Sequence, residues 1–227
     1  MDIYSLHTKR RGASLFADPK NIYGFVHILG QRIRLNILEP FFFNEEFAYQ
    51  FGSQSLNNTP HAVSAYILNL DFGTVTKIYN SALIVRAMYF IASGDSNPND
   101  NIQGGFVSPF HNSQQFTGFS GLFTQLRNIE KLGAGISFKS SILKKPFSLS
   151  SEVFHLNRFQ WKDTNYPIVP NYASRDLGLE WDNQFAWEPM QQLQLQAGLA
   201  WLNPGAAYQP LTHHIYRAFL LAQVRLE

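Results

Sequence analysis

Residues 190–203 read Met-Gln-Gln-Leu-Gln-Leu-Gln-Ala-Gly-Leu-Ala-Trp-Leu-Asn, and this stretch decides the fold class. Apolar side chains occupy every second position from Leu193 to Trp201, and mostly glutamine or glycine stands between them. A period of two is typical of a β-strand with one apolar and one polar face. The stretch therefore predicts a strand that separates an apolar environment from a polar one.

The same alternation recurs along the chain and predicts about ten strands. We expect them near residues 2–8, 22–37, 41–54, 60–72, 78–92, 129–142, 146–162, 174–187, 190–203 and 213–226. Strands of soluble proteins usually have about five or six residues, whereas segments of about ten residues or more suit a tilted membrane crossing. The sequence therefore predicts an all-β fold, an antiparallel transmembrane β-barrel or a large part of one. We expect a single domain over residues 1–227.

The expected connections differ in length between the two ends of the strands. Short connections are expected at 38–40, 73–77, 143–146 and 188–189. Longer ones are expected at the other end, at 54–60, 93–128, 162–173 and 204–212. Outer-membrane barrels have short periplasmic turns and longer extracellular loops. This alternation favours that class of barrel, with 93–128 as a long extracellular or pore-constricting loop.

Composition narrows the function classes. Hydrophobic residues make up 45% of the chain and charged residues only 15%, so the chain has too much apolar surface to be disordered. The net charge is +2, and the basic residues form no dense patch of the kind that binds nucleic acid. Cysteine is absent, which excludes disulfides, thiol nucleophiles and cysteine-based metal sites. No segment approaches the ~20 apolar residues of a membrane-spanning helix, and no cofactor is expected.

Five short motifs follow one another along the chain. They are Leu29-Gly30-Gln31-Arg32, Glu46-Phe47-Ala48-Tyr49-Gln50-Phe51-Gly52, Ala92-Ser93-Gly94-Asp95-Ser96-Asn97-Pro98-Asn99-Asp100, Phe106-Val107-Ser108-Pro109-Phe110 and Arg127-Asn128-Ile129. Each is short, and their order carries the information. In this order the motifs resemble the alginate export family of Gram-negative outer-membrane porins.

The resemblance implies a channel in the bacterial outer membrane for passive passage or export of anionic polysaccharide or small solutes. Its partners are then outer-membrane lipid and the solute, without nucleic acid. Barrels of that family have about eighteen strands, within the range known for bacterial barrels. The chain is therefore expected to form the C-terminal portion of such a barrel. The sequence does not distinguish a monomer from a trimer.

Residues that alternate with the apolar face are expected to line the pore. The candidates are Arg32, Arg34, Glu46, Gln50, Arg86, Lys139, Glu152, Arg158, Glu180, Asp182, Arg217 and Arg225, with Asp71 and Arg175 beside them. Arginine pairs well with carboxylates, so arginines in a pore attract uronate-like anions. The alternative is that each charge pairs across neighbouring strands and only fills the interior. Both possibilities stay open for any single residue.

Three residues of the 93–128 loop suggest a cation site at first sight. Asp95, Asn97 and Asp100 bring carboxylate and amide oxygens close together, as in sites for hard cations. The spacing lacks the closing glutamate of a calcium loop. A hydrated surface loop is therefore favoured, and no metal is expected.

Catalysis is not expected from this sequence. The 7 histidines are scattered, and the chain contains no HExxH or GxSxG motif. His155 and Asn157 resemble parts of a catalytic triad, but both fall on the face of strand 146–162 that is assigned to lipid. The alternative function is a soluble carbohydrate-binding β-protein whose aromatic face stacks on sugars.

The first expected strand decides whether the sheet closes. Segment 2–8 is short and its alternation is weak, so it is a poor partner for segment 213–226. We predict an open or poorly closed, curved antiparallel sheet with unpaired edges at these two segments. Unpaired backbone amides are costly in lipid, so such edges do not persist there in isolation.

Overall fold

The computed structural model describes residues 1–11, 23–56, 59–97, 99–107, 118–119, 126–140, 145–163, 169, 173–209 and 213–224. Strands account for most of them. They are β1 (Asp2–Arg11), β2 (Tyr23–Leu38), β3 (Phe41–Leu56), β4 (Thr59–Ile78), β5 (Ser81–Ala92), β6 (Ile102–Gln103), β7 (Ile129–Ser140), β8 (Phe147–Arg158), β9 (Asp176–Met190), β10 (Leu193–Pro204) and β11 (Ile215–Val224). A short 3-10 helix, η1 (Ala206–Tyr208), follows β10. No helix among the described residues is long and apolar enough to cross a membrane.

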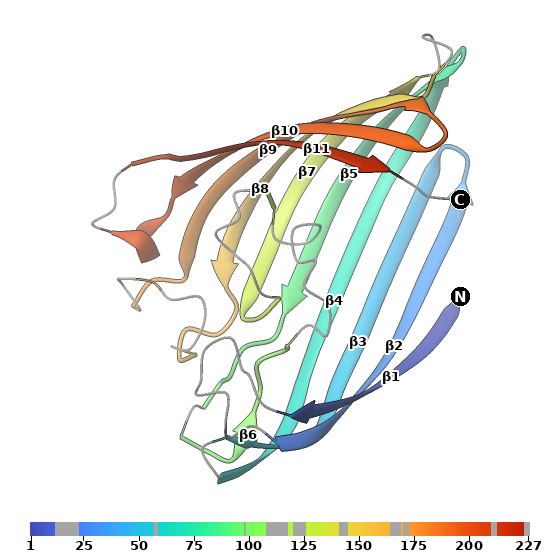
Figure 1. The fold of residues 1–227 in the computed structure, drawn as a ribbon. Coiled ribbons are helices and arrows are strands. Elements are labelled where there is room, and N and C mark those ends of the chain that lie inside the picture. The colour runs from blue at the N-terminus through green and yellow to red at the C-terminus, as the bar shows by residue number, and fades with distance from the viewer. Residues whose placement is uncertain are drawn as a thin grey trace.

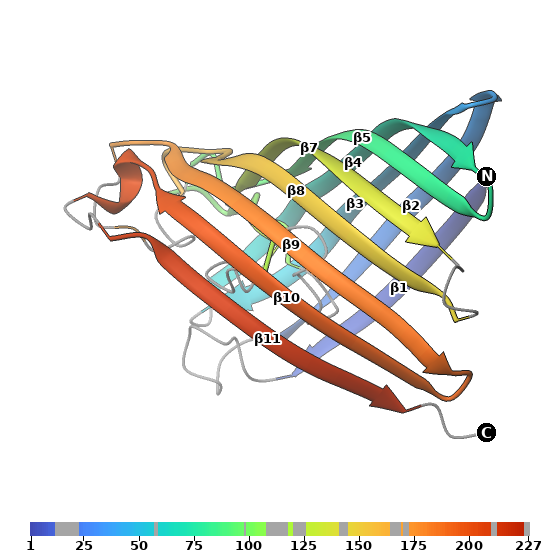
Figure 2. The same ribbon diagram turned by 90° about the horizontal axis from the view of Figure 1, so that it is seen from above.

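All these strands belong to one sheet. Its order is β1-β2-β3-β4-β5-β7-β8-β9-β10-β11, and every neighbouring pair on this path is antiparallel. The two-residue strand β6 pairs in parallel with β4. The sheet curves strongly, as Figures 1 and 2 show. The prediction of an all-β antiparallel fold is confirmed.

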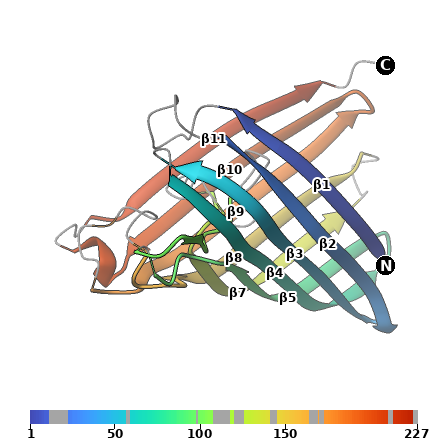
Figure 3. The same ribbon diagram turned by 90° about the horizontal axis from the view of Figure 1, so that it is seen from below.

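The two ends of the sheet remain unpaired with each other. β1 pairs with β2 and β11 pairs with β10, and the described residues contain no ladder between β1 and β11. Figure 3 shows the curved sheet from below, with β1 and β11 as its two borders. The prediction of an open curved sheet with free edges is therefore confirmed for the described part of the chain.

Some strand ends differ from the sequence prediction. β4 continues through the expected turn at 73–77, because Gly73 to Ile78 pair residue by residue with β5. The turn lies at 79–80 instead, and Tyr79 adopts a positive φ of 52° there. Likewise the turn expected at 188–189 lies at 191–192.

The alternation of long and short connections is not strict. Only residues 57–58 lie between β3 and β4, because the ladder between these strands continues to the pair Leu56 and Thr59. The prediction of a longer connection at 54–60 is wrong. The turns at 39–40, 79–80 and 191–192 share one end of the sheet, which we call the tight-turn end. The opposite end carries the segments that follow β5, β8 and β10.

The register divides the side chains between two faces. Residues paired across neighbouring strands share a face, so one row runs through Arg32, Glu46, Asn69, Phe90 and Lys131. We call this the inner face, because the described residues of segments 93–97, 99–107 and 126–128 lie on its side, where Phe106 and Leu126 pack against the sheet (Figure 3). The opposite, outer face carries exposed apolar side chains, among them Leu149, Val153, Trp181, Phe185, Leu199 and Leu220.

The core lies on the inner face, away from the tight-turn end. One cluster joins Ile28, Ala48, Ala65, Ile67, Phe90 and Ala92 of the sheet to Phe106 and Leu126 of the long connection. A second cluster joins Ile129, Phe154, Leu156 and Leu177 to Val169, Ala207 and Tyr208. Phe154 and Leu156 interrupt the polar pattern of this face because they pack under these segments.

Candidate functional site

The candidate site is the polar part of the inner face. The register places Arg32, Arg34, Glu46, Gln50, Asp71, Arg86, Lys139, Glu152, Arg158, Glu180, Asp182 and Arg217 on this one face. Arg225 lies outside the described residues. The strands therefore bring together on one face candidates that stand nearly 200 positions apart in the sequence, and the sheet that carries them is strongly curved (Figure 2).

Several of these charges pair with each other. Arg32 Nη2 lies 2.9 Å from Glu46 Oε1, and the Tyr4 hydroxyl donates to the same oxygen at 3.1 Å. Arg86 forms an ion pair with Glu152, and its Nη1 lies 3.7 Å from Asp71 Oδ2. Cross-strand pairing therefore accounts for part of the interior charge.

Two exposed cations on this face have no ion-pair partner among the described residues. Arg34 and Lys139 are both exposed, and neither has an ion-pair partner within the described residues. Both stand near the tight-turn end of their strands. A cation that no carboxylate neutralises can attract an anionic solute.

Unlike Arg34 and Lys139, Arg158 is buried and hydrogen-bonded to main-chain carbonyls. Its side chain is fully buried, and its guanidinium donates to the main-chain carbonyls of Trp161 at 2.6 Å, Asp163 at 2.8 Å and Ser174 at 3.4 Å. Five donors in a planar fork suit such a cluster of carbonyls. Arg158 therefore anchors the segment after β8 to the inner face.

The long connection after β5 is attached to the inner face at its near end. Gln50 of β3 is only 1% exposed, and its amide makes two hydrogen bonds with the backbone of Val107. Val107 N–H donates to Gln50 Oε1, and Gln50 Nε2 donates to Val107 O, both at 3.1 Å. Ser93 Oγ donates to Gly104 O at 2.8 Å and holds the same segment folded back on itself.

A second attachment lies farther along this connection. Phe119 N–H donates to Asp182 Oδ2 at 2.8 Å, and Arg217 Nη1 donates to Phe119 O at 3.3 Å. The Phe119 ring lies 5.3 Å from the Phe219 ring of β11. Gly118, with φ +90°, leaves a β-carbon position only 2.5 Å from Glu180 Oε1, so only glycine fits against this wall. The described parts of the connection thus contact β3 at one point and β9 and β11 at another.

Asp95, Asn97 and Asp100 stabilise the loop itself. Asp95 Oδ1 accepts from Asn97 N–H at 3.1 Å, and Asp100 Oδ1 accepts from Ile102 N–H at 2.8 Å. Asp95 N–H donates in turn to Asp163 Oδ2 at 2.8 Å. Burial raises the pKa of the Asp95 carboxyl above its ordinary value. These carboxylates act as acceptors for backbone N–H groups.

A comparison with known protein families agrees with the arrangement of these elements. The family model described as Alginate export matches residues 1–217. The chain belongs to the alginate export family. No curated protein matches it. Alginate export is an outer-membrane channel family, which agrees with the antiparallel sheet and its apolar outer face.

One charge of this alginate export family member lies elsewhere than expected. Arg175 precedes β9, and its Nη2 lies 3.2 Å from Glu130 Oε2. Glu130 pairs in register with Ile91 and Asn157, so it belongs to the outer face. The expectation that Arg175 faces the interior is wrong, because Arg175 lies outside the strand and the period of two does not apply to it.

His155 and Asn157 lie on the outer face, as the alternation predicts. His155 Nε2 lies 2.9 Å from Asp176 Oδ1, and Asn157 Nδ2 lies 3.3 Å from His155 Nδ1. Both ring nitrogens of His155 are therefore engaged by Asp176 and Asn157. Neither nitrogen is free to activate a serine in this arrangement.

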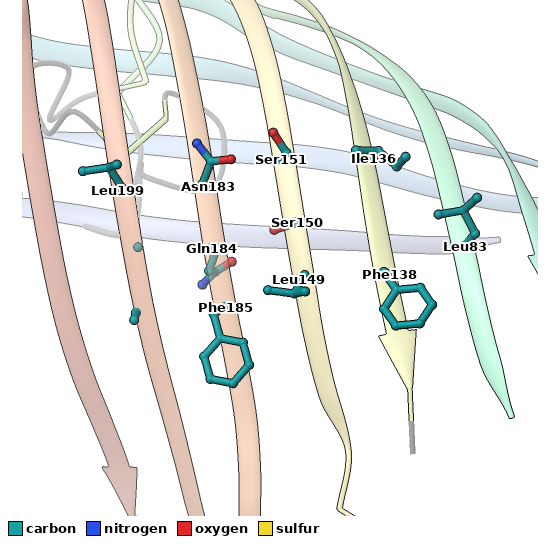
Figure 4. Close-up of a pocket in the computed structure, with 12 residues that line it drawn as sticks. Leu83, Ile136, Phe138, Leu149, Ser150, Ser151, Asn183, Gln184, Phe185 and Leu199 are labelled. Atoms are coloured by element: carbon teal, nitrogen blue, oxygen red, sulfur yellow. The ribbon is translucent and has the colours of Figure 1, made fainter. Parts of the chain in front are cut away.

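The outer face of the barrel wall is hollowed across β5 and β7 to β10. A depression of about 540 Å³ is walled by Leu83, Ile136, Phe138, Leu149, Phe185 and Leu199. Figure 4 shows these side chains with Ser151 and Asn183 among them. Ser151 Oγ accepts from Trp181 Nε1 at 2.8 Å. The depression is mainly apolar, as expected for a surface that lipid covers.

Sequence reasoning missed two inner-face features. Lys131 is 4% exposed, and its Nζ lies 4.1 Å above the Phe154 ring. It stands one position before the alternating stretch 132–139, so extending the pattern by one residue finds it. The other feature is a chain of hydrogen-bonded glutamines on β9 and β10, whose polar character the alternation shows but whose contacts it does not.

Proposed function

We propose that this chain forms part of the wall of an outer-membrane channel for passive passage or export of anionic polysaccharide or small solutes. One observation carries the proposal, which is the division of one curved sheet into a charged inner face and an apolar outer face. The outer face presents exposed leucine, isoleucine, phenylalanine and tryptophan side chains to lipid. Soluble proteins, including sugar-binding ones, rarely expose so large an apolar surface.

The charges that remain after pairing favour anions. Arg32 and Arg86 are matched by carboxylates, whereas Arg34 and Lys139 are exposed without an ion-pair partner in the described part of the chain. Unneutralised cations in a pore raise the local concentration of anions. The inner face therefore favours solutes that carry carboxylates.

The connection 93–128 is proposed to narrow the channel. Its contact with Gln50 on β3 and its contact with Asp182 on β9 are separated by four strands of the sheet, β4, β5, β7 and β8. The described part of this connection therefore occupies the space in front of the inner face at two points, beside β3 and beside β9. Its main-chain groups then share that space with the solute.

Planar bilayers give the test. The full-length protein, reconstituted into a bilayer under a salt gradient, is expected to produce discrete conductance steps and a reversal potential on the anion-selective side. A protein that stays monomeric and water-soluble without detergent and gives no conductance contradicts the proposal.

A further inference from the structure

The tight-turn end of the inner face carries a hollow that the charge pairs described above do not use. A row of paired residues crosses five strands there, running through Lys77, Ala82, Lys139, Ser148 and Ala186. Alanine has almost no side chain, so Ala82 leaves space between the two lysines. A hollow of about 520 Å³ lies at this place, lined by both lysines, Ser148 and Gln194.

The two lysines are only weakly neutralised. Lys77 Nζ lies 4.0 Å from Glu39 Oε1, and these side chains are 78% and 93% exposed, so solvent screens the pair. Lys139 is exposed and has no ion-pair partner in the described residues. One carboxylate, that of Glu188, also lines the hollow, and its Oε1 accepts from Gln194 Nε2 at 3.1 Å. The hollow therefore carries more positive than negative charge.

A chain of amides leads from this hollow along the inner face. Gln194 Nε2 donates to Glu188 Oε1, Gln196 Nε2 donates to Gln194 Oε1 at 3.0 Å, and Gln184 Nε2 donates to Gln196 Oε1 at 3.4 Å. Each amide has two donors and an acceptor with two lone pairs. Every glutamine of this chain of amides therefore keeps unused hydrogen-bond donors or acceptors. Hydroxyl-rich ligands use such groups, because a hydroxyl also both donates and accepts.

We propose that this hollow binds an acidic sugar unit of a polysaccharide, with its carboxylate between Lys77 and Lys139 and its hydroxyls on Ser148 and the glutamine chain. One strand, β5, separates the two lysine-bearing strands, so their backbones lie about 9–10 Å apart. Two long lysine side chains can close on one carboxylate across that distance. Tight turns of outer-membrane barrels face the periplasm, so the hollow receives the polymer as it reaches the channel from that side. This inference rests on the proposed function.

Binding measurements on the full-length protein in detergent test the site. The probes are a trimeric oligouronate and the neutral oligosaccharide of the same length, measured by isothermal titration calorimetry. Lys139→Gln is expected to raise the Kd of the oligouronate about fivefold, the size of one exposed charge pair. Lys139→Arg keeps the charge and is expected to bind normally. Lys162→Gln removes an exposed lysine that follows β8 at the opposite end of the sheet, where its Nζ lies 5.6 Å from the Trp161 ring, and serves as the matched control.

A second measurement compares the two sides of the membrane to which the oligouronate is added. In a planar bilayer, oligouronate added on the side of the tight turns is expected to block the wild-type current at lower concentration than oligouronate added on the opposite side. Lys77→Gln and Lys139→Gln are both expected to reduce this difference, with block in each variant measured relative to its own current in salt alone. An unchanged oligouronate Kd and unchanged block in both variants, in a channel that still conducts, overturns the lysine site alone. Absence of conductance in the wild-type protein overturns the proposed function instead.

Discussion

Substituting Gln50 tests how firmly the long connection is held on the inner face. The Gln50 amide forms two hydrogen bonds with Val107, both at 3.1 Å, from a side chain that is 1% exposed. A typical hydrogen bond contributes about 0.5–1.5 kcal/mol net, so Gln50→Leu should cost the attachment about 2 kcal/mol. A change of about 1.4 kcal/mol is tenfold in an equilibrium constant, so the detached state becomes about 30-fold more populated.

Hydrogen exchange measures this population directly. In lipid nanodiscs, the backbone amides around Val107 are expected to exchange about 30-fold faster in Gln50→Leu, because exchange there proceeds through local opening. Gln184→Leu removes an amide from the same inner face whose hydrogen bond goes to Gln196 instead, so exchange near Val107 should stay at the wild-type rate. Unchanged exchange in Gln50→Leu, or an equal rise in both variants, refutes the assigned role of Gln50.

Three further changes probe other parts of the fold. Gly178→Ala is expected to destabilise the protein by about 1–3 kcal/mol in urea unfolding, because φ is +123° and a β-carbon collides with the Asn203 carbonyl oxygen; a wild-type midpoint contradicts this. Leu199→Arg on the outer face should cost about 2–4 kcal/mol of folding free energy in lipid, whereas Gln196→Arg on the inner face should be tolerated; equal losses contradict the assignment of faces. Burial raises the pKa of Asp95, so the folded loop binds this proton more tightly than the unfolded chain does. The contribution of Asp95 to stability is therefore largest at low pH and falls as the pH rises from the ordinary carboxyl pKa to the raised one, and Asp95→Asn should remove that part of the pH dependence; an unchanged profile contradicts it.

The division into two faces could be predicted from the sequence because the side-chain period of a strand is two. In β10, Leu199 lies on the outer face and Gly198 on the inner one, as the alternation indicates, and the register with β9 preserves this order. Turn positions were harder to predict. Gly73 looks like the start of a turn, yet it pairs with Arg86 inside a continuous ladder. Hydrogen bonding between strands overrides local propensity there.

Contacts between distant segments could not be predicted. Phe119 bonds to Asp182 across 63 positions, and nothing in the periodicity of either segment indicates this pair. The position of Arg158 on the polar side of β8 predicts a pore-lining residue. A cation on the inner face contacts either the solute or buried main-chain carbonyls, depending on which segment covers it. The alternation of a strand shows the face of a residue but not what covers that face.

We propose that the inner face of the sheet meets water while the outer face meets lipid. Because the chain has no cysteine, single cysteines can be introduced along β10 without background. In nanodiscs, a membrane-impermeant thiol reagent is expected to label cysteines at Gln194 and Gln196 and to leave those at Leu195 and Leu199 unlabelled. Labelling that does not alternate along β10, or that favours the two leucine positions, contradicts the account.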